Sequence, residues 1–266
     1  MGGESEATKT PRDGAGYPAR SRYQGAVAKD YLEGRVHDPR WQREQDVIEA
    51  FLQGLPAGST IVDLPLGTGR FVEFYAAFGH TVYGVDVSRD MIAQARREAA
   101  THQGSLVPLL GEAERIPLRD GAVDNVVCVR FLNWVPLPVA TRILSEFHRI
   151  ARKKVLVHIR TKEPLDGPGL ARTLAGELST QPVSLLRRFA GAIRLGLRSV
   201  APGSAGKAAP EATGHVLHDA TRLEEAFKEV GFAVLEKTFI ESTTAYAKSQ
   251  SEPLNVYVLG RAEQDD

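Results

Sequence analysis

Two aspartates and two glycines in the first third of the chain have the types and spacing of a nucleoside-binding site. Asp63 ends an apolar run, and Gly67 and Gly69 follow it in a short turn. Seventeen residues after Gly69, Asp86 ends a second apolar run. Glycine reaches backbone conformations closed to other residues, so the turn can approach a ligand closely. A carboxylate at the end of the second run can accept hydrogen bonds from both hydroxyls of a ribose, which favours a nucleoside as the ligand.

The context of the glycine turn separates this interpretation from its alternatives. A two-glycine turn alone is equally explained as a structural turn, but this one lies between a strand-like and a helix-like run, about twenty residues before the second acid. A dinucleotide fingerprint would place a third glycine three residues after Gly69, where the chain has Val72. No Gly-Lys-Ser or Gly-Lys-Thr ends the turn, which excludes a P-loop. The pattern therefore disfavours a pyrophosphate cradle.

The elements that must position these residues alternate along the chain. A helix is expected ahead of the first strand, over Trp41–Leu52. Strands are then expected over Thr60–Leu64, Thr81–Val85, Ser105–Leu110, Asn125–Val129 and Lys154–Ile159, and helices over Arg70–Phe78, Arg89–Ala100 and Val139–Ala151. Five such strands with helices between them predict a mainly parallel sheet covered on both faces, with ligands at the carboxyl ends of the strands.

The end of the chain follows a different pattern. A helix is expected over Leu223–Val230, followed by two strands over Phe232–Ile240 and Leu254–Leu259. Only a loop connects these two strands, so an antiparallel pair is favoured over a crossover.

Composition bounds the class of protein. The 266 residues fit one large domain, and lysine plus arginine balance aspartate plus glutamate at 33 each, so no global field marks a protein that coats nucleic acid. The single cysteine, Cys128, lies in an apolar run; this excludes an internal disulfide framework and a cysteine-rich metal site, and no other spacing supports a metal. Residues 1–22 are expected to be a flexible N-terminus with neither a secretory signal nor a membrane span. We expect a cytoplasmic protein.

Three ordered motifs resemble the class I S-adenosylmethionine-dependent methyltransferases. The first is the acid and glycine turn from Asp63 to Gly69, and the second is the strand end and acid in Val85–Met91. The third is Gly111–Asp124, which is similar to the family's segment that contacts adenine and leads into the fourth strand. The resemblance covers residues 31–159 well and the two final strands more loosely.

The resemblance implies the fold, the cofactor and its contacts. The fold would be α/β, a Rossmann-like seven-stranded, mostly parallel sheet with an antiparallel final strand, and the cofactor S-adenosyl-L-methionine. Gly67 and Gly69 would lie against the amino-acid part of the cofactor, and Asp86 would hold its ribose. Met91 would pack near the adenine, and the pair Glu112-Ala113 would face its amino group and ring. The implied cofactor residues are Asp63, Leu66, Gly67, Gly69, Asp86, Met91, Glu112, Ala113 and Arg130.

Departures from the family pattern alter the expected contacts. Pro65 stands where the family most often has its first glycine, and Glu112 stands where an aspartate is commoner. Proline has no N–H and a fixed torsion, so the turn is expected to bind through Leu66, Gly67 and later groups. Ala151–Lys154 replaces the usual Lys-Pro-Gly-Gly turn before the fifth strand. We interpret these differences as variation within the family.

Methyl transfer asks little of the protein in the way of proton transfer. Alignment of the acceptor and exclusion of water are the main requirements, and a base is useful only for an acceptor such as a hydroxyl or phenol. The candidate catalytic residues are His215, His218 and Asn133, which follow the fourth strand or lead back from the region after the fifth. Each has an ordinary alternative, such as a capped turn at Asn133, a helix cap at Asp219 beside His218, or, for His158 within a strand, a core histidine.

Residues 161–214 interrupt the alternation and are expected to form a lid-like helical insertion after the fifth strand, within a methyltransferase domain over residues 23–266. One helix is expected over Ser184–Val200, where apolar and arginine residues occupy different faces. A lid over the acceptor, a surface anchor on anionic lipid and a simple packed helix all fit this pattern. We favour a lid or a packed helix over peripheral membrane contact through residues 184–200.

The sequence therefore predicts a methyltransferase that acts on a small organic or lipid-like acceptor, at oxygen rather than at nitrogen or carbon. One alternative is a nucleic-acid or protein methyltransferase that uses the arginine helix as its contact surface, although the neutral composition argues against nucleic acid. The other is a regulatory module that binds a nucleoside without turnover. No feature of the sequence indicates an oligomeric state.

Overall fold

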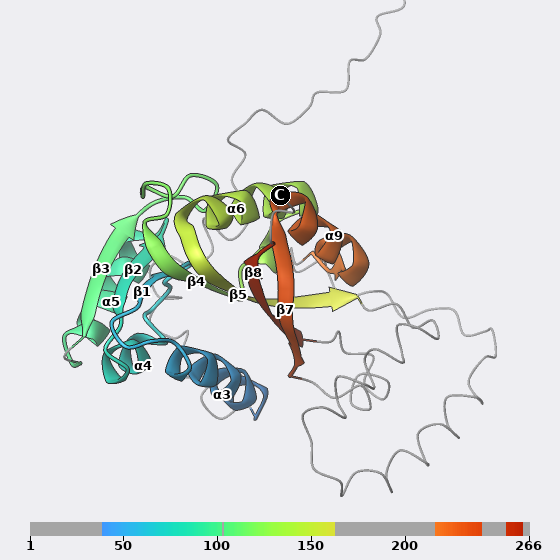
Figure 1. The fold of residues 1–266 in the computed structure, drawn as a ribbon. Helices are drawn as coiled ribbons and strands as arrows, with labels where there is room; N and C mark the ends of the chain where they lie inside the picture. The colour runs from blue at the N-terminus through green and yellow to red at the C-terminus, as the bar shows by residue number, and fades with distance from the viewer. Residues whose placement is uncertain (1–38, 103, 163–215, 241–253, 263–266) are drawn as a thin grey trace, which may run out of the picture.

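The computed structural model describes residues 39–102, 104–162, 216–240 and 254–262, which form a sheet with helices on both faces (Figure 1). The helices are α3 (Pro39–Gln53), α4 (Val72–Ala77), α5 (Arg89–Ala99), α6 (Leu137–Ile150) and α9 (Ala220–Val230), with a 3₁₀ turn η1 (Leu132–Trp134). The strands are β1 (Thr60–Asp63), β2 (Thr81–Asp86), β3 (Ser105–Leu110), β4 (Val123–Val129), β5 (Ala151–Lys162), β6 (His218–Asp219), β7 (Phe232–Phe239) and β8 (Leu254–Arg261).

The strands are ordered β3-β2-β1-β4-β5-β8-β7 across the sheet. Neighbours from β3 to β5 pair in parallel, whereas β8 runs antiparallel to both β5 and β7. The expected seven-stranded, mostly parallel sheet with an antiparallel final strand is confirmed, and the two-residue β6 adds a short parallel pair at the end of β5. The strand order reverses between β1 and β4, which is where open α/β sheets bind their ligands.

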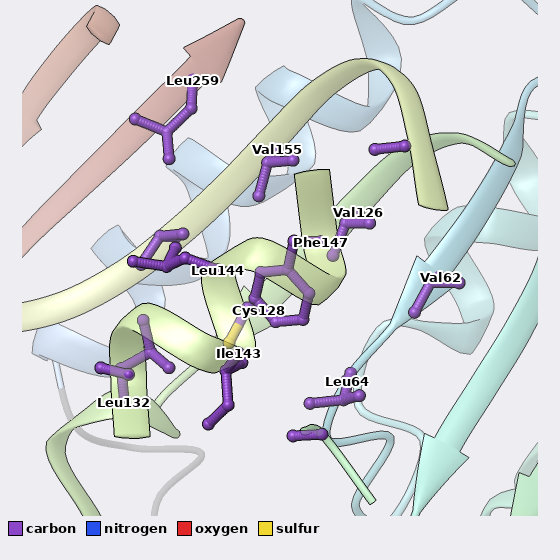
Figure 2. Close-up of a cluster of buried hydrophobic side chains, with 14 of the residues drawn as sticks. Val62, Leu64, Val126, Cys128, Leu132, Ile143, Leu144, Phe147, Val155 and Leu259 are labelled. Atoms are coloured by element: carbon purple, nitrogen blue, oxygen red, sulfur yellow. The ribbon is translucent and has the colours of Figure 1, made fainter. Parts of the chain in front are cut away.

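Helices α6 and α9 cover one face of the sheet. Figure 2 shows Ile143, Leu144 and Phe147 of α6 in one cluster with Val126 and Cys128 of β4, and all five side chains are fully buried. Full burial of a side chain of this size contributes roughly 1.5–3 kcal/mol, so this layer holds α6 firmly on the sheet. Cys128 is the core residue that the sequence indicated, and burial raises the pKa of its thiol far above the ordinary value.

Helices α3, α4 and α5 cover the opposite face. Ile48 and Leu52 of α3 and Tyr75 of α4 are buried together with Ile61 of β1 and Val127 of β4. These strand residues alternate with those that face α6, because successive side chains of a strand point to opposite faces. The two covered faces that the sequence predicted are therefore present, and α3 is placed to reach the carboxyl ends of the central strands.

Element boundaries differ from the expected ones where tertiary pairing extends or trims a local pattern. β5 begins three residues before the expected Lys154–Ile159 run and ends three residues after it, because β4 and β8 pair along it and β6 pairs with its last two residues. α4 begins at Val72, two residues after the expected start at Arg70, since the glycine turn continues to Phe71.

Several expectations fall outside the described residues and stay predictions. They are the flexible N-terminus over residues 1–22, most of the insertion over 161–214 with its helix over 184–200, and the candidate His215. Among the helices that the structure describes, none is both long enough and apolar enough to cross a membrane.

Candidate functional site

A cavity opens at the carboxyl ends of β1, β2 and β4, where the strand order reverses. It holds about 1030 Å³ of empty space, its open mouth included. Eight of the nine residues implied as cofactor contacts line it, namely Asp63, Leu66, Gly67, Asp86, Met91, Glu112, Ala113 and Arg130. The strand ends thus gather residues that are up to 67 positions apart in the sequence around one space.

Gly69, the ninth implied contact, does not line the cavity and instead lies against α5. Its backbone is left-handed (φ 86°), and a Cβ there would come within 3.1 Å of the Cα atom of Ala95. A substitution would therefore strain the backbone and push on α5. Helix packing explains this glycine without a ligand contact.

Asp86 links the glycine turn to the start of α5. Its Oδ2 accepts a hydrogen bond from the N–H of Gly67 at 2.9 Å, and its Oδ1 accepts one from the N–H of Ser88 at 2.8 Å. Burial raises the pKa of the Asp86 carboxyl, and hydrogen bonds from the backbone of Ser88, Gly67 and Val87 partly counter that effect. Each carboxylate oxygen has two lone pairs, so the side chain keeps acceptor capacity for ribose hydroxyls.

The backbone of the turn is already engaged at the positions that were expected to bind. The N–H of Leu66 donates to the carbonyl of Val85 at 2.9 Å, and the N–H of Gly67 is held by Asp86. Leu66 therefore presents its side chain to the cavity and not a backbone donor. That side chain fills the space beside Gly84, where a Cβ would lie 2.6 Å from its nearest methyl carbon. Sequence analysis did not single out Gly84, whose role depends on a neighbour across the sheet edge.

Thr68 offers the polar atom that the turn leaves open. Its side chain lines the cavity, and its buried Oγ1 has no hydrogen-bond partner within the described residues. A buried hydroxyl without a partner is unfavourable, so a polar ligand group in the cavity would satisfy it. This observation fits a nucleoside cofactor that carries polar groups against the turn. The residue escaped sequence reasoning, which concentrated on the flanking glycines.

Asp63 ends β1 at the floor of the cavity in a desolvated setting. Burial raises the pKa of the Asp63 carboxyl well above its ordinary value; the Tyr75 hydroxyl opposes this, and the nearby charge of Asp86 adds to it. Arg70 favours the charged form but does not outweigh burial. Burial therefore favours the neutral form of this carboxyl relative to an exposed aspartate.

The loop after β3 carries Glu112 and is fixed by α6. Arg149 donates from Nη1 to the carbonyl of Leu118 at 2.7 Å and from Nη2 to the carbonyl of Ile116 at 3.1 Å. The N–H of Ile116 in turn donates to Glu146 at 2.9 Å, and Glu146 is paired with Arg149. This pair on α6 therefore sets the position of the loop that was expected to meet the adenine.

A buried group of charged residues, here called the Glu44 cluster, forms the wall of the cavity beneath α3. It consists of Trp41, Glu44, Arg70, Arg130 and His158. The Glu44 carboxylate pairs with both arginines and lies 3.0 Å from Nε2 of His158. Both guanidinium groups lie over the ring of Trp41. The guanidinium carbon of Arg70 is 3.3 Å from the ring centroid, and that of Arg130 is 4.7 Å from it. Trp41 and both arginines line the cavity.

The charges of this cluster stabilise one another away from water. Burial alone would raise the pKa of Glu44, but the close contact of Nε2 of His158 and the charge of Arg130 outweigh it and hold that pKa well below the ordinary value of 4.5. Burial lowers the pKa of His158, whose Nδ1 accepts a hydrogen bond from the N–H of Arg130 at 3.3 Å. His158 is therefore neutral, with its proton on Nε2 facing the carboxylate.

The sequence held one signal for Glu44 that was not used. Trp41, Glu44, Ile48 and Leu52 recur at helical spacing and are all buried. An acidic residue on the apolar face of a helix has to find a buried partner, because a lone buried carboxylate is strongly unfavourable.

The described catalytic candidates are engaged in the scaffold. Asn133 donates from Nδ2 to the carbonyls of Arg160 and Val216, both at 2.8 Å, and its Oδ1 accepts from the N–H of Arg160. His218 is buried, and its Nε2 lies 2.9 Å from the carbonyl of Leu132. Asp219 caps α9 through the N–H of Arg222, which was the ordinary alternative for that residue. Neither Asn133 nor His218 lines the cavity.

Comparison with known proteins assigns the part of the chain that builds this cavity. Residues 62–159 match the model of the family described as "Methyltransferase domain", a segment that runs from β1 to β5 and includes the turn, Asp86 and the Glu112 loop. This segment therefore matches a methyltransferase domain.

The curated relatives of this methyltransferase domain are named for different acceptors. The chain is 34% identical over 107 residues to a malonyl-[acyl-carrier protein] O-methyltransferase of Pectobacterium atrosepticum, a match that covers 39% of this chain and 40% of that protein. It is 35% identical over 97 residues to the ubiquinone/menaquinone biosynthesis C-methyltransferase of Rubrivivax gelatinosus, which covers 36% of each chain. The match thus spans about two fifths or less of the length of these curated relatives.

A solved structure extends the likeness of the fold beyond the matched segment. The magnesium protoporphyrin IX methyltransferase from Synechocystis, crystallised with S-adenosylhomocysteine, superposes with a TM-score of 0.54 over 90% of this chain and 88% of its own. At 16% sequence identity, this likeness concerns the fold alone.

Proposed function

We propose that this protein transfers a methyl group from S-adenosylmethionine to an oxygen atom of a small organic or lipid-like acceptor. The observation that carries the proposal is the cavity at the β1–β2–β4 strand ends of a methyltransferase domain. Its wall combines the hydrogen-bond acceptor Asp86, the hydroxyl of Thr68, which has no partner within the described residues, and the apolar side chains of Leu66 and Met91. This mixture of a few polar groups and a mainly apolar lining suits a nucleoside with an aliphatic tail.

Each part of the cavity has a role toward that cofactor. Asp86 would accept hydrogen bonds from the ribose, and Thr68 would donate one to a polar group beside the turn. Met91 and Ala113 would contact the adenine, with Glu112 at its amino group. When bound, the cofactor supplies a methyl group that its sulfonium has already activated. The protein's own contribution is then to orient the acceptor and exclude water.

The scaffold roles of His158 and His218 bear on the kind of methyl acceptor that the cavity can use. His158 and His218 are buried and lie against partners within the fold, so neither is poised to take a proton from a substrate in the cavity. An acceptor that is already a good nucleophile needs no such base. Transfer to oxygen is supported by the O-methyltransferases among the relatives, whereas one relative is named a C-methyltransferase.

The test is transfer of a labelled methyl group from S-adenosylmethionine into small molecules, lipids, nucleic acids and proteins fractionated from a cell extract. The proposal expects label in the small-molecule or lipid fraction, on an oxygen identified by mass spectrometry and NMR. Label in the nucleic-acid or protein fraction, or on carbon, would contradict the proposed acceptor. Cofactor binding without any transfer would instead indicate a regulatory module.

A further inference from the structure

The wall formed by the Glu44 cluster carries two cationic side chains, Arg70 and Arg130, on one carboxylate. Arg70 and Arg130 are both cationic, and the single carboxylate of Glu44 faces them. His158 adds no charge, since its Nδ1 accepts the N–H of Arg130 and burial lowers its pKa. Asp63, the next acid toward β1, is held toward its neutral form by burial. Positive charge from the two guanidinium groups therefore lies at a surface that lines the cavity.

Arg130 is the residue through which that charge can reach a ligand. Its Nε lies 3.0 and 2.9 Å from the two oxygens of Glu44, and its Nη2 lies 2.8 Å from one of them. This contact occupies one edge of the guanidinium. Within the described residues, Nη1 has no hydrogen-bond partner, and the side chain is 26% exposed where it lines the cavity. A guanidinium fixed on one side and open on the other suits bidentate or end-on binding of an anion.

The backbone and the neighbours of Arg130 hold the open edge in place. Arg130 directly follows β4 and has a left-handed conformation (φ 57°), which is uncommon for a residue other than glycine. Its N–H is held by His158, its Nε by Glu44, and its guanidinium lies over the ring of Trp41. Three separate interactions that fix one residue favour a positioned binding group over a surface cation.

We propose that Arg130 is a carboxylate-binding residue of the cavity, with Glu44 and His158 as its positioning residues. The inference rests on the proposed function, and two carboxylates fit it: the amino-acid end of the cofactor, or the acid group of an acceptor. The second source agrees with the scaffold roles of His158 and His218, because a carboxylate is ionised at neutral pH and needs no base. An oxygen lone pair of that carboxylate would form the new O–C bond as the bond from methyl to sulfur breaks. The electron pair would remain on sulfur, and no proton would move.

Tryptophan fluorescence gives a readout that does not depend on activity. The chain has two tryptophans, Trp41 and Trp134, and both line the cavity. The first arm of the experiment compares the dissociation constant of S-adenosylhomocysteine with that of 5′-methylthioadenosine, which lacks the amino-acid end. The second arm compares octanoate with its methyl ester, on protein with and without saturating S-adenosylhomocysteine. Arg130→Gln is the test variant, and Arg142→Gln on the surface of α6 is the matched control.

The expected result is a selective loss in one arm. In Arg130→Gln, the dissociation constant of the carboxylate ligand rises about 10- to 100-fold, which is the range for a charge-assisted hydrogen bond, while that of its partner ligand changes less than about twofold. Loss in the first arm assigns the cofactor's carboxylate, and loss in the second assigns an acceptor's. Arg142→Gln changes neither. The proposal would be overturned if, in both arms, the ratio of the two ligands' dissociation constants is the same in wild type and in Arg130→Gln.

Two further measurements keep the test decisive. If thermal unfolding shows that Arg130→Gln is destabilised by the stranded Glu44, the double variant Glu44→Gln/Arg130→Gln carries the same comparison. Arg130→Lys keeps the charge but not the planar fork, so partial rescue of the affected affinity is expected. Wild-type protein that binds neither nucleoside would refute the proposed cofactor, and the octanoate arm without S-adenosylhomocysteine would still test Arg130.

Discussion

Substitution of Glu44 by glutamine should destabilise the protein far more than the same change at an exposed ion pair. Glu44 is fully buried and faces Arg70, Arg130 and His158. Removal of one partner from a buried charged group costs about 3–5 kcal/mol, because the remaining charges stay desolvated. At about 2–4 °C per kcal/mol for a domain of this size, the melting temperature should fall by roughly 6–20 °C.

The matched control is Glu114→Gln. Glu114 pairs with Arg142 at 2.7 Å, but the arginine side chain is 58% exposed. Surface pairs of this kind contribute about 0–1 kcal/mol, so this variant should melt within a few degrees of wild type. Urea unfolding of the two variants at neutral pH provides the comparison. Equal free energies of unfolding would show that burial of the Glu44 cluster does not stabilise the fold.

The effect of Glu44 on stability should depend on pH in one direction. Its folded-state pKa lies below the ordinary value of 4.5, so the unfolded state takes up a proton first as the pH falls. The stabilisation is complete above about pH 5 and is lost as the pH drops below 4.5 toward the folded-state value. The difference in free energy of unfolding between wild type and Glu44→Gln should therefore become smaller as the pH falls. A gap that widens below pH 4.5 would contradict the assigned pKa direction.

Three other predictions test the scaffold of the cavity. Gly69→Ala should lower the free energy of unfolding by more than Gly79→Ala does. Both glycines have a left-handed backbone, which costs another residue about 1–2 kcal/mol, but only Gly79 has open space for a Cβ. Equal losses in urea unfolding would refute the packing role of Gly69. Gly84→Ala should displace the Leu66 side chain and weaken binding of S-adenosylhomocysteine, measured by fluorescence, and unchanged affinity would argue against that contact. Arg149→Gln should release the loop after β3 and weaken adenosine binding, and an unaltered dissociation constant would show that the loop holds its position alone.

The sheet could be predicted because its signals are local. Apolar runs in the central strands and helical spacing in α6 are properties of short segments, so the order of elements could be predicted from the sequence. Asp86 could also be predicted, since the acid, the turn and the next strand form one continuous motif. Boundaries such as the ends of β5 depend on partners far along the chain and were less accurate.

The wall of the cavity could not be predicted in the same way. Glu44 and Arg130 are 86 residues apart and meet only because α3 and the end of β4 face the same space. Gly69 looked like a ligand contact because of its motif, but its Cβ position points at α5. Likewise, the backbone N–H of Leu66 donates to the carbonyl of Val85 in the neighbouring strand and is not available to a ligand. In each case tertiary contacts decided the role of a residue whose type alone allowed several.

Binding of the cofactor in the cavity through Asp86 is the most direct requirement of the proposed function. Isothermal titration calorimetry of the folded protein with S-adenosylhomocysteine should show one saturable site. Asp86→Ala should weaken binding at least about tenfold through the loss of charge-assisted hydrogen bonds to the ribose, with Glu98→Ala on the exposed side of α5 as the control. Circular dichroism would establish that both variants are folded. Absence of binding to folded wild type, or an unchanged affinity in Asp86→Ala, would contradict the central claim.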